Sequence, residues 1–334
     1  MIITRTPYRL SFFGGGTDYP AWYQEHGGAV LATTIDKYCY ISCRYLPPFF
    51  EHKSRVIYSK IEMVNQVSEI VHPPVRECLK YLNIDKGVEI HHDGDLPART
   101  GVGSSSSFTV GLLHALYSLI GEMPTKRQLC LDAIHLEQKL LKENVGSQDQ
   151  TLAAFGGFNL IKFGGADAVT VLPVTISLER LTSLKSHLML FFTGFSRTAS
   201  HIASEQIHNI PQKKEELSTM FQMVDEGLTI LNSESDITEF GKLLHESWKI
   251  KRSLSSKITL PIIDEIYEVA RSAGAIGGKL IGAGGGGFLL IFAEPKDHPK
   301  IKNKLKSFLH VPFNFETLGS QVIYYAPTSH NYLS

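Results

Sequence analysis

Residues Leu96 to Ser107 read LPARTGVGSSSS and lead directly into an apolar stretch that starts at Phe108. Glycine lets a backbone approach a ligand closely and adopt positive φ angles. The stretch from Phe108 to Ile120 is apolar almost all round, which predicts a buried helix. The first turn of such a helix presents unpaired N–H groups and the positive end of the helix dipole. The segment therefore predicts an anion site suited to a polyphosphate, and its serines can cap the helix or ligate a cation.

Two familiar nucleotide motifs do not describe this segment. No lysine follows Gly103, so it is not the G-x-x-x-x-G-K-[ST] loop of the common nucleotide-binding proteins. It also lacks the G-x-G-x-x-G that dinucleotide-binding folds carry between a strand and a helix. The structural alternative is a serine-capped buried helix that follows a glycine turn.

The composition limits the classes of function. The chain of 334 residues is long enough for two packed domains, and 43% of its residues are hydrophobic. Its 33 basic and 33 acidic residues cancel, so no general attraction to nucleic acid or to an acidic membrane surface is expected. The apolar runs are too short to cross a bilayer, the first residues do not resemble a signal peptide, and the four cysteines lack metal-finger spacing. We therefore expect a cytoplasmic protein with reduced, buried thiols.

Strand and helix patterns alternate without the regular rhythm of a doubly wound sheet, which predicts an α+β fold. Strands are expected at residues 2–13, 29–45, 88–92, 158–163, 169–174, 187–193 and 288–293. Helical periodicity is expected at residues 108–120, 126–142, 205–231, 237–251 and 262–273. The junction between two domains is expected at residues 173–184.

Arg9 and Asp18 lie where the first predicted strand runs into the turn Gly14-Gly15-Gly16-Thr17-Asp18. A guanidinium can steady phosphate charge, and a carboxylate can accept hydrogen bonds from sugar hydroxyls. The alternative is a solvent-facing arginine and an aspartate that only forms the turn.

Two carboxylates follow the anion site along the chain. Glu137 lies in a predicted amphipathic helix, and Asp149 comes just after the turn at Gly146. Carboxylates held at different places can divide the work of metal binding and proton removal. The alternative is two solvated carboxylates that neither bind a metal nor remove a proton.

Five of the six residues from Gly282 to Gly287 are glycines, directly before a predicted strand. Glycine is costly to order, so the run indicates a backbone that passes very near a ligand or another chain segment. A flexible linker is the alternative, but apolar residues flank the run on both sides.

Taken in this order, the four segments resemble those of the GHMP kinases, the family of galactokinase, homoserine kinase, mevalonate kinase and phosphomevalonate kinase. The resemblance spans nearly the whole chain. It implies an N-terminal domain at residues 1–178 that is similar to the second domain of ribosomal protein S5. It also implies a ferredoxin-like C-terminal domain at residues 179–334, with the active site in the cleft between the two.

The resemblance also implies roles, carried over position by position. The phosphates of ATP would lie over a phosphate cradle formed by Gly101, Val102, Gly103, Ser104, Ser105, Ser106 and Ser107. Mg²⁺ would be held by Ser105 and Glu137. Asp149 resembles the catalytic aspartate of the family, and Arg9 resembles its charge-stabilising arginine. The residues implied on the substrate side are Gly15, Gly16, Thr17, Asp18, Arg99, Arg197, Gly284 and Gly285.

Within the family, the sequence from Phe13 to Tyr19, FGGGTDY, resembles the D-glycero-D-manno-heptose 7-phosphate kinases and, less closely, the fucokinases. The turn from Phe192 to Arg197 also looks like that of the heptose kinases. Galactokinases carry Gly-Glu-His-Thr-Asp at the first position, so galactose is not expected. The resemblance implies phosphorylation of the anomeric C1 hydroxyl of heptose 7-phosphate to the 1,7-bisphosphate, which feeds nucleotide-activated heptose for surface polysaccharide.

Several alternatives stay open at this point. The chain resembles other anomeric sugar kinases, such as L-fucokinase, and a non-catalytic sensor of sugar and ATP is a second alternative. A nicotinamide oxidoreductase is suggested by glycine richness alone. The expected partner is a small-molecule sugar phosphate, with no nucleic acid and no membrane, and a homodimer is left open. The phosphate of such a substrate needs a cationic pocket, for which the candidates are Arg99, Arg197, Lys251, Arg252 and Lys279.

Overall fold

The structure is a computed structural model that describes residues 1–165, 168–194 and 199–327, and its strands form two sheets. The strands are β1 (Ile2–Phe13), β2 (Gly28–Tyr45), β3 (Ser54–Ile57), β4 (Ile61–Val64), β5 (Val88–Gly94), β6 (Phe158–Phe163), β7 (Val169–Pro173), β8 (Leu188–Phe192), β9 (Ala275–Leu280), β10 (Phe288–Ala293), β11 (Leu309–His310), β12 (Phe315–Glu316) and β13 (Gln321–Tyr325). The first sheet has the order β13-β1-β2-β5-β3-β4, and β6 and β12 also pair with β2. The second sheet has the order β11-β8-β10-β9.

The helices cover both sheets. They are α1 (Pro20–His26), α2 (Pro73–Tyr81), α3 (Ser104–Leu119), α4 (Lys126–His135), α5 (Gln148–Phe155), α6 (Leu178–Ser186), α7 (Ala199–Asn209), α8 (Lys214–Asn232), α9 (Thr238–Ser253), α10 (Pro261–Ser272) and α11 (His298–Lys304). Short turns are η1 (Val67–Glu69), η2 (Leu136–Leu140), η3 (Ile210–Gln212) and η4 (Pro295–Asp297). No helix in the described part of the chain is long and apolar enough to cross a membrane.

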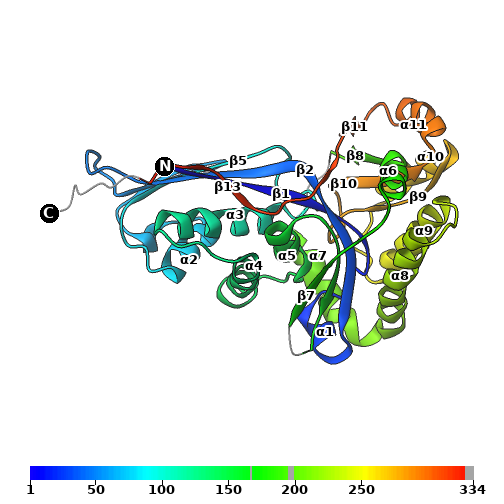
Figure 1. The fold of residues 1–334 in the computed structure, drawn as a ribbon, viewed down its shortest axis with the longest axis horizontal. Helices are drawn as coiled ribbons and strands as arrows, with labels where there is room; N and C mark the ends of the chain where they lie inside the picture. The colour runs from blue at the N-terminus through cyan, green and yellow to red at the C-terminus, as the bar shows by residue number, and fades with distance from the viewer. Residues whose placement is uncertain (166–167, 195–198, 328–334) are drawn as a thin grey trace.

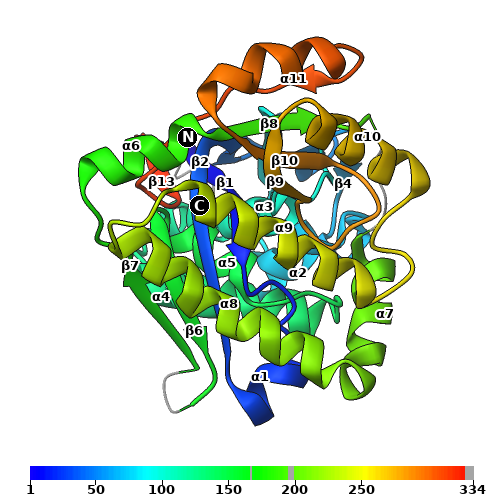
Figure 2. The same cartoon turned by 90° about the vertical axis from the view of Figure 1, so that its right-hand side faces the viewer.

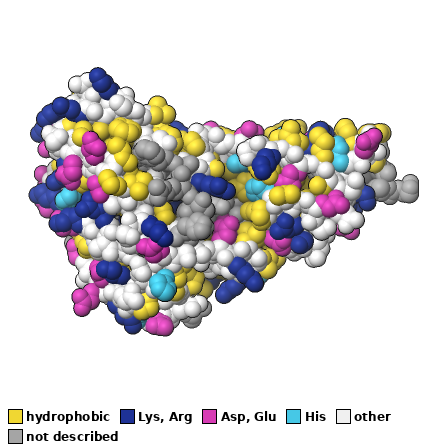
Figure 3. Space-filling view, turned by 180° about the vertical axis from the view of Figure 1, so that it is seen from behind, with side chains coloured by type: hydrophobic (Ala, Val, Ile, Leu, Met, Phe, Trp, Pro, Cys, Tyr) yellow, Lys and Arg dark blue, Asp and Glu magenta, His cyan; other side chains and the backbone are white. Residues whose placement is uncertain are grey.

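Figure 1 shows the two sheets in separate parts of an elongated molecule. The long sheet runs from the end that carries the N-terminus, with α2, α3, α4 and α5 on one of its faces. The smaller sheet lies at the other end, together with α9, α10 and α11. Figure 2, turned to face that end, shows α8 and α9 side by side. The space-filling view in Figure 3 shows basic and acidic side chains interspersed over the face opposite to Figure 1.

The long strand β1 fixes the position of α3. β1 is largely buried, pairs with β13 and β2 in the first sheet and packs against α3. Gly111 brings α3 so close to it that a Cβ at this position would lie 2.8 Å from Thr6 Oγ1. The Thr4 hydroxyl donates a hydrogen bond to the Gly111 carbonyl at 2.9 Å. The start of α3, which carries the phosphate cradle, is therefore held at a fixed place along β1.

The expected strands and helices are confirmed in most cases, and one expectation was wrong. Residues 205–231 do not form one helical run: α7 and α8 are separated by η3, because Pro211 has no N–H to continue a helix. The expected junction at residues 173–184 contains helix α6. Its N-cap is Ser177, whose side chain accepts from the Arg180 N–H.

The last described strands return to the first sheet. β13 pairs antiparallel with β1, and β12 pairs antiparallel with β2. The sequence reasoning assigned everything after residue 178 to the second domain and did not foresee this return. The boundary at residue 178 stays a prediction.

Candidate active site

The phosphate cradle begins at the turn that precedes α3. Gly103 has a left-handed backbone (φ +75°), and no side chain caps the helix. The first helical hydrogen bond runs from the Ser107 N–H to the Gly103 carbonyl at 2.9 Å, so the N–H groups of residues 104–106 have no helical partner. The Arg99 N–H donates to Ser104 Oγ at 3.1 Å and closes the loop. The backbone here suits an anion.

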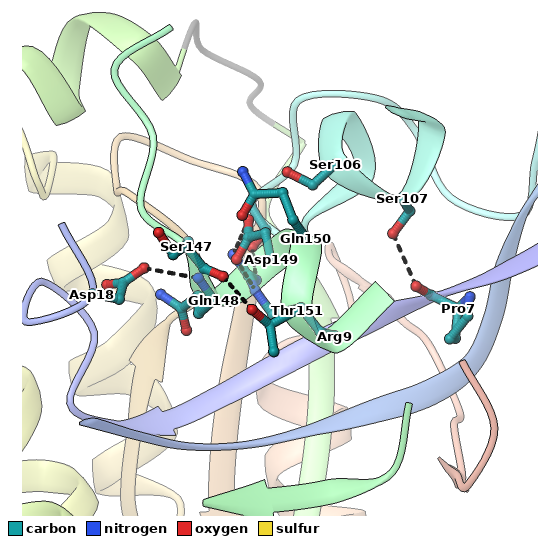
Figure 4. A network of polar contacts seen from close by, with 12 residues as sticks. Pro7, Arg9, Asp18, Ser106, Ser107, Ser147, Gln148, Asp149, Gln150 and Thr151 are labelled. Carbon is teal, nitrogen blue, oxygen red and sulfur yellow. Dashed lines mark hydrogen bonds and ion pairs between the residues drawn. The ribbon is translucent and has the colours of Figure 1, made fainter. Parts of the chain in front are cut away.

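Two members of the cradle face the protein interior. The Ser107 hydroxyl donates to the Pro7 carbonyl at 2.9 Å, as Figure 4 shows. Val102 is wholly buried, and its carbonyl accepts from the Arg9 N–H at 3.0 Å. These contacts anchor the cradle on β1, a structural role that the sequence reasoning did not separate from phosphate binding.

Arg9 and Asp149 form a bidentate ion pair between β1 and α5 (Figure 4). Arg9 Nε donates to Asp149 Oδ1 at 2.7 Å, and Nη2 donates to Oδ2 at 2.8 Å. Arg9 Nη1 donates to the carbonyl of Gly101. Gly103 lies against the pair, because a Cβ at this position would lie 3.4 Å from Asp149 Oδ2. The structure therefore brings the two predicted catalytic residues together, directly beside the cradle.

Asp18 is buried, and its carboxylate faces backbone N–H groups. Oδ1 accepts from the Gly16 N–H at 2.9 Å, and Oδ2 accepts from the Gln148 N–H at 3.4 Å. A Cβ on Gly146 would lie only 1.9 Å from Oδ2. Burial raises the pKa of Asp18; the hydrogen bond from Gly16 opposes the rise, and the charge of Asp149 adds to it. Asp18 thus ties the glycine turn to the loop before Asp149, and its contact with a sugar stays a prediction.

The other predicted substrate residues of this turn differ in their surroundings. Thr17 is wholly buried, and its hydroxyl donates to the carbonyls of Gly14 at 2.8 Å and Ala29 at 2.9 Å. Gly16 is buried and has φ +108°. Gly15 is partly exposed. Of the three, Gly15 is therefore the one that is open to a ligand.

Glu137 lies in the π-helical turn η2 and is 1% exposed. Its Oε2 atom accepts from Ser106 Oγ at 2.8 Å and from Gln150 Nε2, whereas its Oε1 atom has no hydrogen-bond partner. Burial raises the pKa of Glu137 to about 7. The serine in contact with Glu137 is Ser106, whereas Ser105 is exposed. The sequence reasoning had paired Glu137 with Ser105 and had missed Gln150.

The oxygens around Glu137 fit a hard cation such as Mg²⁺. Glu137 Oε1 and Gln150 Oε1 are both buried without a hydrogen-bond partner, and Ser106 Oγ lies beside them. Carboxylate, amide and hydroxyl oxygens are the donors that Mg²⁺ accepts, with water and phosphate oxygens completing its shell. Among the described residues, no group of three or more His, Cys, Asp or Glu could hold a metal. These residues therefore suit a cation that is also bound by a nucleotide.

The glycine run from Gly282 to Gly287 packs against other backbone. A Cβ on Gly282 would lie 2.4 Å from Gly101 Cα, and a Cβ on Gly287 would lie 2.1 Å from the Thr100 carbonyl oxygen. The same test places a Cβ on Gly284 at 2.6 Å from the Ile258 carbonyl oxygen, which also accepts from the Gly285 N–H at 2.8 Å. The run thus supports the cradle from behind, and the contact of Gly284 and Gly285 with substrate stays a prediction.

Two buried lysines lie next to the glycine run. Lys251 on α9 is 6% exposed and donates to the carbonyls of Leu280, at 3.3 Å, and Gly282. Lys279 on β9 is 2% exposed and donates to the Phe12 carbonyl at 2.7 Å. Burial lowers the pKa of Lys251 to about 7, and the charge of Arg9 acts in the same direction. Burial also holds the pKa of Lys279 well below its usual range.

The remaining candidates for a cationic pocket are less enclosed. Arg252 pairs with Asp264 at 2.9 Å. Arg99 is exposed and has a left-handed backbone (φ +62°). Arg197 lies outside the described residues.

The sequence itself indicates that Lys251 is buried. Phe240, Leu244 and Trp248 mark the apolar side of α9 at helical spacing, and all three are wholly buried. Lys251 follows at the next position of this stripe, so the helical period predicts a buried lysine. A lysine is seldom fully buried unless it has a partner, which makes the position informative.

The chain belongs to the GHMP kinase family. Residues 69–157 match the family model of the GHMP kinase N-terminal domain, and residues 229–311 match that of the GHMP kinase C-terminal domain, together more than half of the chain. The predicted α+β fold of this family is therefore confirmed. Members of the family are ATP-dependent kinases.

The chain is similar to a D-glycero-alpha-D-manno-heptose 7-phosphate kinase of Campylobacter jejuni, with 27% identity over 88% of this chain and 90% of that protein. A crystal structure of a D-glycero-D-manno-heptose 1-phosphate kinase from Bacteroides thetaiotaomicron matches with a TM-score of 0.76 and 25% identity, over 97% of this chain and all of that one. The L-fucokinase/L-fucose-1-P guanylyltransferase of Bacteroides fragilis is 25% identical over 87% of this chain, which spans 34% of that longer protein.

Proposed function

We propose that the chain is an ATP-dependent kinase for the anomeric C1 hydroxyl of D-glycero-D-manno-heptose 7-phosphate, and that it forms the 1,7-bisphosphate. The observation that carries the proposal is the contact of the Arg9–Asp149 pair with the cradle at Gly103, where a Cβ would lie 3.4 Å from Asp149 Oδ2. We infer that an acceptor hydroxyl and a phosphoryl group meet beside this carboxylate and guanidinium.

Phosphoryl transfer depends mainly on positioning and on electrostatic stabilisation. In the proposed mechanism, the free N–H groups at the start of α3 bind phosphate oxygens. The positive charge of Arg9, whose Nη1 donates to the Gly101 carbonyl in the cradle, stabilises the charge of the transferred group. Asp149 orients the C1 hydroxyl and accepts its proton. Because an anomeric hydroxyl is more acidic than an ordinary alcohol, orientation is the larger part of this role.

Glu137 and a serine of the cradle would hold Mg²⁺ together with Gln150. When bound, the cation would offset the charge of the β- and γ-phosphates of ATP. The sequence predicts Ser105 as the serine ligand, and the hydrogen bond of Ser106 to Glu137 makes Ser106 the second candidate. Alanine variants of the two serines, compared by Mg²⁺ titration, distinguish them.

Two findings support a heptose substrate. The turn FGGGTDY at residues 13–19 resembles that of the heptose 7-phosphate kinases, and the Campylobacter jejuni relative is named for this activity. The Bacteroides thetaiotaomicron structure is named for heptose 1-phosphate instead. The two names place the first phosphate on different carbons, so the position of the new phosphate has to be measured.

An L-fucokinase is the second candidate, because the fucokinase of Bacteroides fragilis covers most of this chain at similar identity. A sensor that binds sugar and ATP without turnover is a third candidate. The buried oxygens of Glu137 and Gln150, which suit a cation, and the bidentate Arg9–Asp149 pair favour catalysis over a sensor.

The deciding experiment is an ADP-release assay over a panel that contains heptose 7-phosphate, heptose 1-phosphate, L-fucose and D-mannose. We expect the highest kcat/KM with heptose 7-phosphate. The product should lose its new phosphate in mild acid, because anomeric phosphates hydrolyse readily and primary phosphates do not. An acid-stable product, or a preference for L-fucose, would contradict the proposal, and nucleotide binding without turnover of any sugar would favour the sensor.

A further inference from the structure

Gly15 is the one glycine of the turn Gly14-Gly15-Gly16 that the fold itself does not require. Gly14 has φ +81°, and a Cβ there would lie 1.9 Å from the Ala29 carbonyl oxygen. Gly16 has φ +108°, which disfavours any side chain. Gly15 has no positive φ, and the nearest atoms to a Cβ there would be 3.8 Å away. Since neither strain nor close packing explains this glycine, its presence calls for another reason.

Two polar side chains approach Gly15. The point that a Cβ would occupy lies 3.8 Å from Gln148 Nε2 and 3.8 Å from Ser11 Oγ. Ser11 is 6% exposed, and its hydroxyl has no hydrogen-bond partner. The Oε1 atom of Gln148 is also buried without a partner. Buried polar groups are rarely left unpaired, because an unmade hydrogen bond inside a protein is costly. An unpaired hydroxyl at Ser11, with the Gln148 Nε2 group at the same distance from Gly15, is what a missing polar ligand leaves.

Both residues are neighbours of the Arg9–Asp149 pair. Tyr8 to Ser11 pair with β2 in an unbroken register, so Arg9 and Ser11 project from the same face of β1. Gln148 directly precedes Asp149 in the first turn of α5. A hydroxyl held by Ser11 and Gln148 would therefore lie next to the hydroxyl that faces Asp149.

We propose that Ser11, Gln148 and the space beside Gly15 form a subsite for the C2 hydroxyl of the sugar, the neighbour of the C1 hydroxyl that is phosphorylated. The subsite makes the enzyme specific for aldoses with a free hydroxyl at C2. The inference rests on the proposed function, since it needs a sugar whose C1 hydroxyl faces Asp149. The Ser11 hydroxyl and the Gln148 carboxamide bind the C2 hydroxyl, and the absence of a side chain at residue 15 leaves room for it.

A substrate–enzyme double-variant cycle tests the subsite. The kcat/KM for heptose 7-phosphate is divided by that for its 2-deoxy analogue, in the natural protein and in Ser11→Ala. We expect a ratio of at least roughly tenfold in the natural protein, and a fall of roughly five- to tenfold in this ratio in Ser11→Ala. Comparing the two ratios cancels the effect of the C2 hydroxyl on the intrinsic reactivity at C1. An unchanged ratio in Ser11→Ala would overturn the proposal.

Ser247→Ala is the matched control. Ser247 is also wholly buried with an unpartnered hydroxyl, but it lies on α9 in the other part of the molecule. Its replacement should leave the ratio for the two sugars unchanged. An equal fall in both variants would mean that Ser11 acts only through the general packing of the protein, and the subsite would be wrong.

Gly15→Ala tests the space directly. Its backbone accepts alanine without strain, so the melting temperature should stay the same or rise slightly. We expect the KM for the sugar to rise at least roughly tenfold, with the KM for ATP unchanged. A normal KM for the sugar in this folded variant would contradict the proposal.

Failure of the subsite and failure of the proposed function give different results. If heptose 7-phosphate is not turned over but L-fucose or D-mannose is, the heptose assignment fails, and the cycle is run with that sugar and its 2-deoxy analogue. If heptose 7-phosphate is turned over and the Ser11 and Gly15 variants behave like the natural protein, only the subsite fails. If no sugar of the panel is turned over, both proposals fail.

Discussion

The candidate site has a proposed phosphate side, formed by the cradle and the glycine run, and a proposed sugar side around the Arg9–Asp149 pair, and the two are built from different parts of the chain. On the phosphate side, backbone meets backbone: Gly101 of the cradle lies against Gly282 of the glycine run, with no room for a side chain at either. On the sugar side, side chains make the contacts, above all in the Arg9–Asp149 pair. A substitution on the phosphate side should therefore act first on the fold. A substitution on the sugar side should act first on the reaction.

The largest expected effect is on the sugar side. Asp149→Asn should lower kcat at least roughly a hundredfold, because an amide cannot accept the proton of the acceptor hydroxyl. The measurement is a steady-state ADP-release assay, with circular dichroism to show that the fold is kept. Asp264→Asn is the matched control, since Asp264 also pairs with an arginine, Arg252, at 2.9 Å. Near-normal turnover in Asp149→Asn would remove Asp149 from the mechanism.

On the phosphate side, Gly282→Ala should lower the free energy of unfolding by about 3 kcal/mol. Part of this cost is the left-handed backbone (φ +80°), and part is the clash of the Cβ with Gly101 Cα at 2.4 Å. Gly121→Ala separates the two, because Gly121 has φ +83° and no atom within 4 Å of its Cβ position. We expect about 1 kcal/mol for Gly121→Ala by urea unfolding. Equal costs in the two variants would show that the backbone contact is unimportant.

Lys251 joins the two sides, because it binds the carbonyl of Gly282 and lies close enough to Arg9 for their charges to interact. Lys251→Met should raise the free energy of unfolding by about 2 kcal/mol near pH 7, because it removes a buried charge. The folded protein holds the pKa of Lys251 at about 7, against 10.5 as its ordinary value. The natural protein binds fewer protons than the unfolded chain in this interval, so its stability rises with pH from about 7 toward 10.5.

The gain from Lys251→Met should therefore be largest at or below pH 7 and should shrink toward pH 9 and above. Urea unfolding at several pH values measures it. Lys249→Met is the control on the same helix, because Lys249 is exposed and pairs with Glu246 at 2.9 Å. A gain that does not depend on pH would contradict the depressed pKa of Lys251.

The smallest of these effects concerns the cation. Glu137→Gln should raise the Mg²⁺ concentration for half-maximal activity about tenfold, since a neutral amide replaces the buried carboxylate. A Mg²⁺ titration at saturating ATP measures this change. Glu246→Gln, at an exposed position on α9, should leave the titration unchanged. If Glu137→Gln loses activity that no amount of Mg²⁺ restores, Glu137 has a role other than binding the cation.

Local patterns in the sequence predicted most of the long strands and helices. The strands at Phe158–Phe163 and Phe288–Ala293 have the predicted bounds, because short apolar runs between turn residues mark buried strands. The returning strands β12 and β13 were missed. They are short and partly exposed, and only their pairing with β2 and β1 makes them strands.

The sequence alone located the candidate site but not the contacts within it. It placed an anion-binding turn before α3 and two carboxylates after it, and the family models confirm the kinase family that these motifs predicted. It did not show that Ser106 rather than Ser105 contacts Glu137, because the two serines differ only in the helix face on which they lie. That face is set by the packing of α3 on β1.

The glycines show most clearly that the sequence does not reveal which residues are in contact. The sequence by itself indicated a turn at Gly14-Gly15-Gly16 and, from Gly282 to Gly287, a backbone that passes near a ligand or another segment. Only the tertiary structure showed the neighbours, since Gly282 lies against Gly101 and Gly15 lies near Ser11 and Gln148. The physical reason is that local sequence fixes backbone conformation and helical or strand period. The neighbours of a residue are fixed by how segments more than a hundred residues apart pack together.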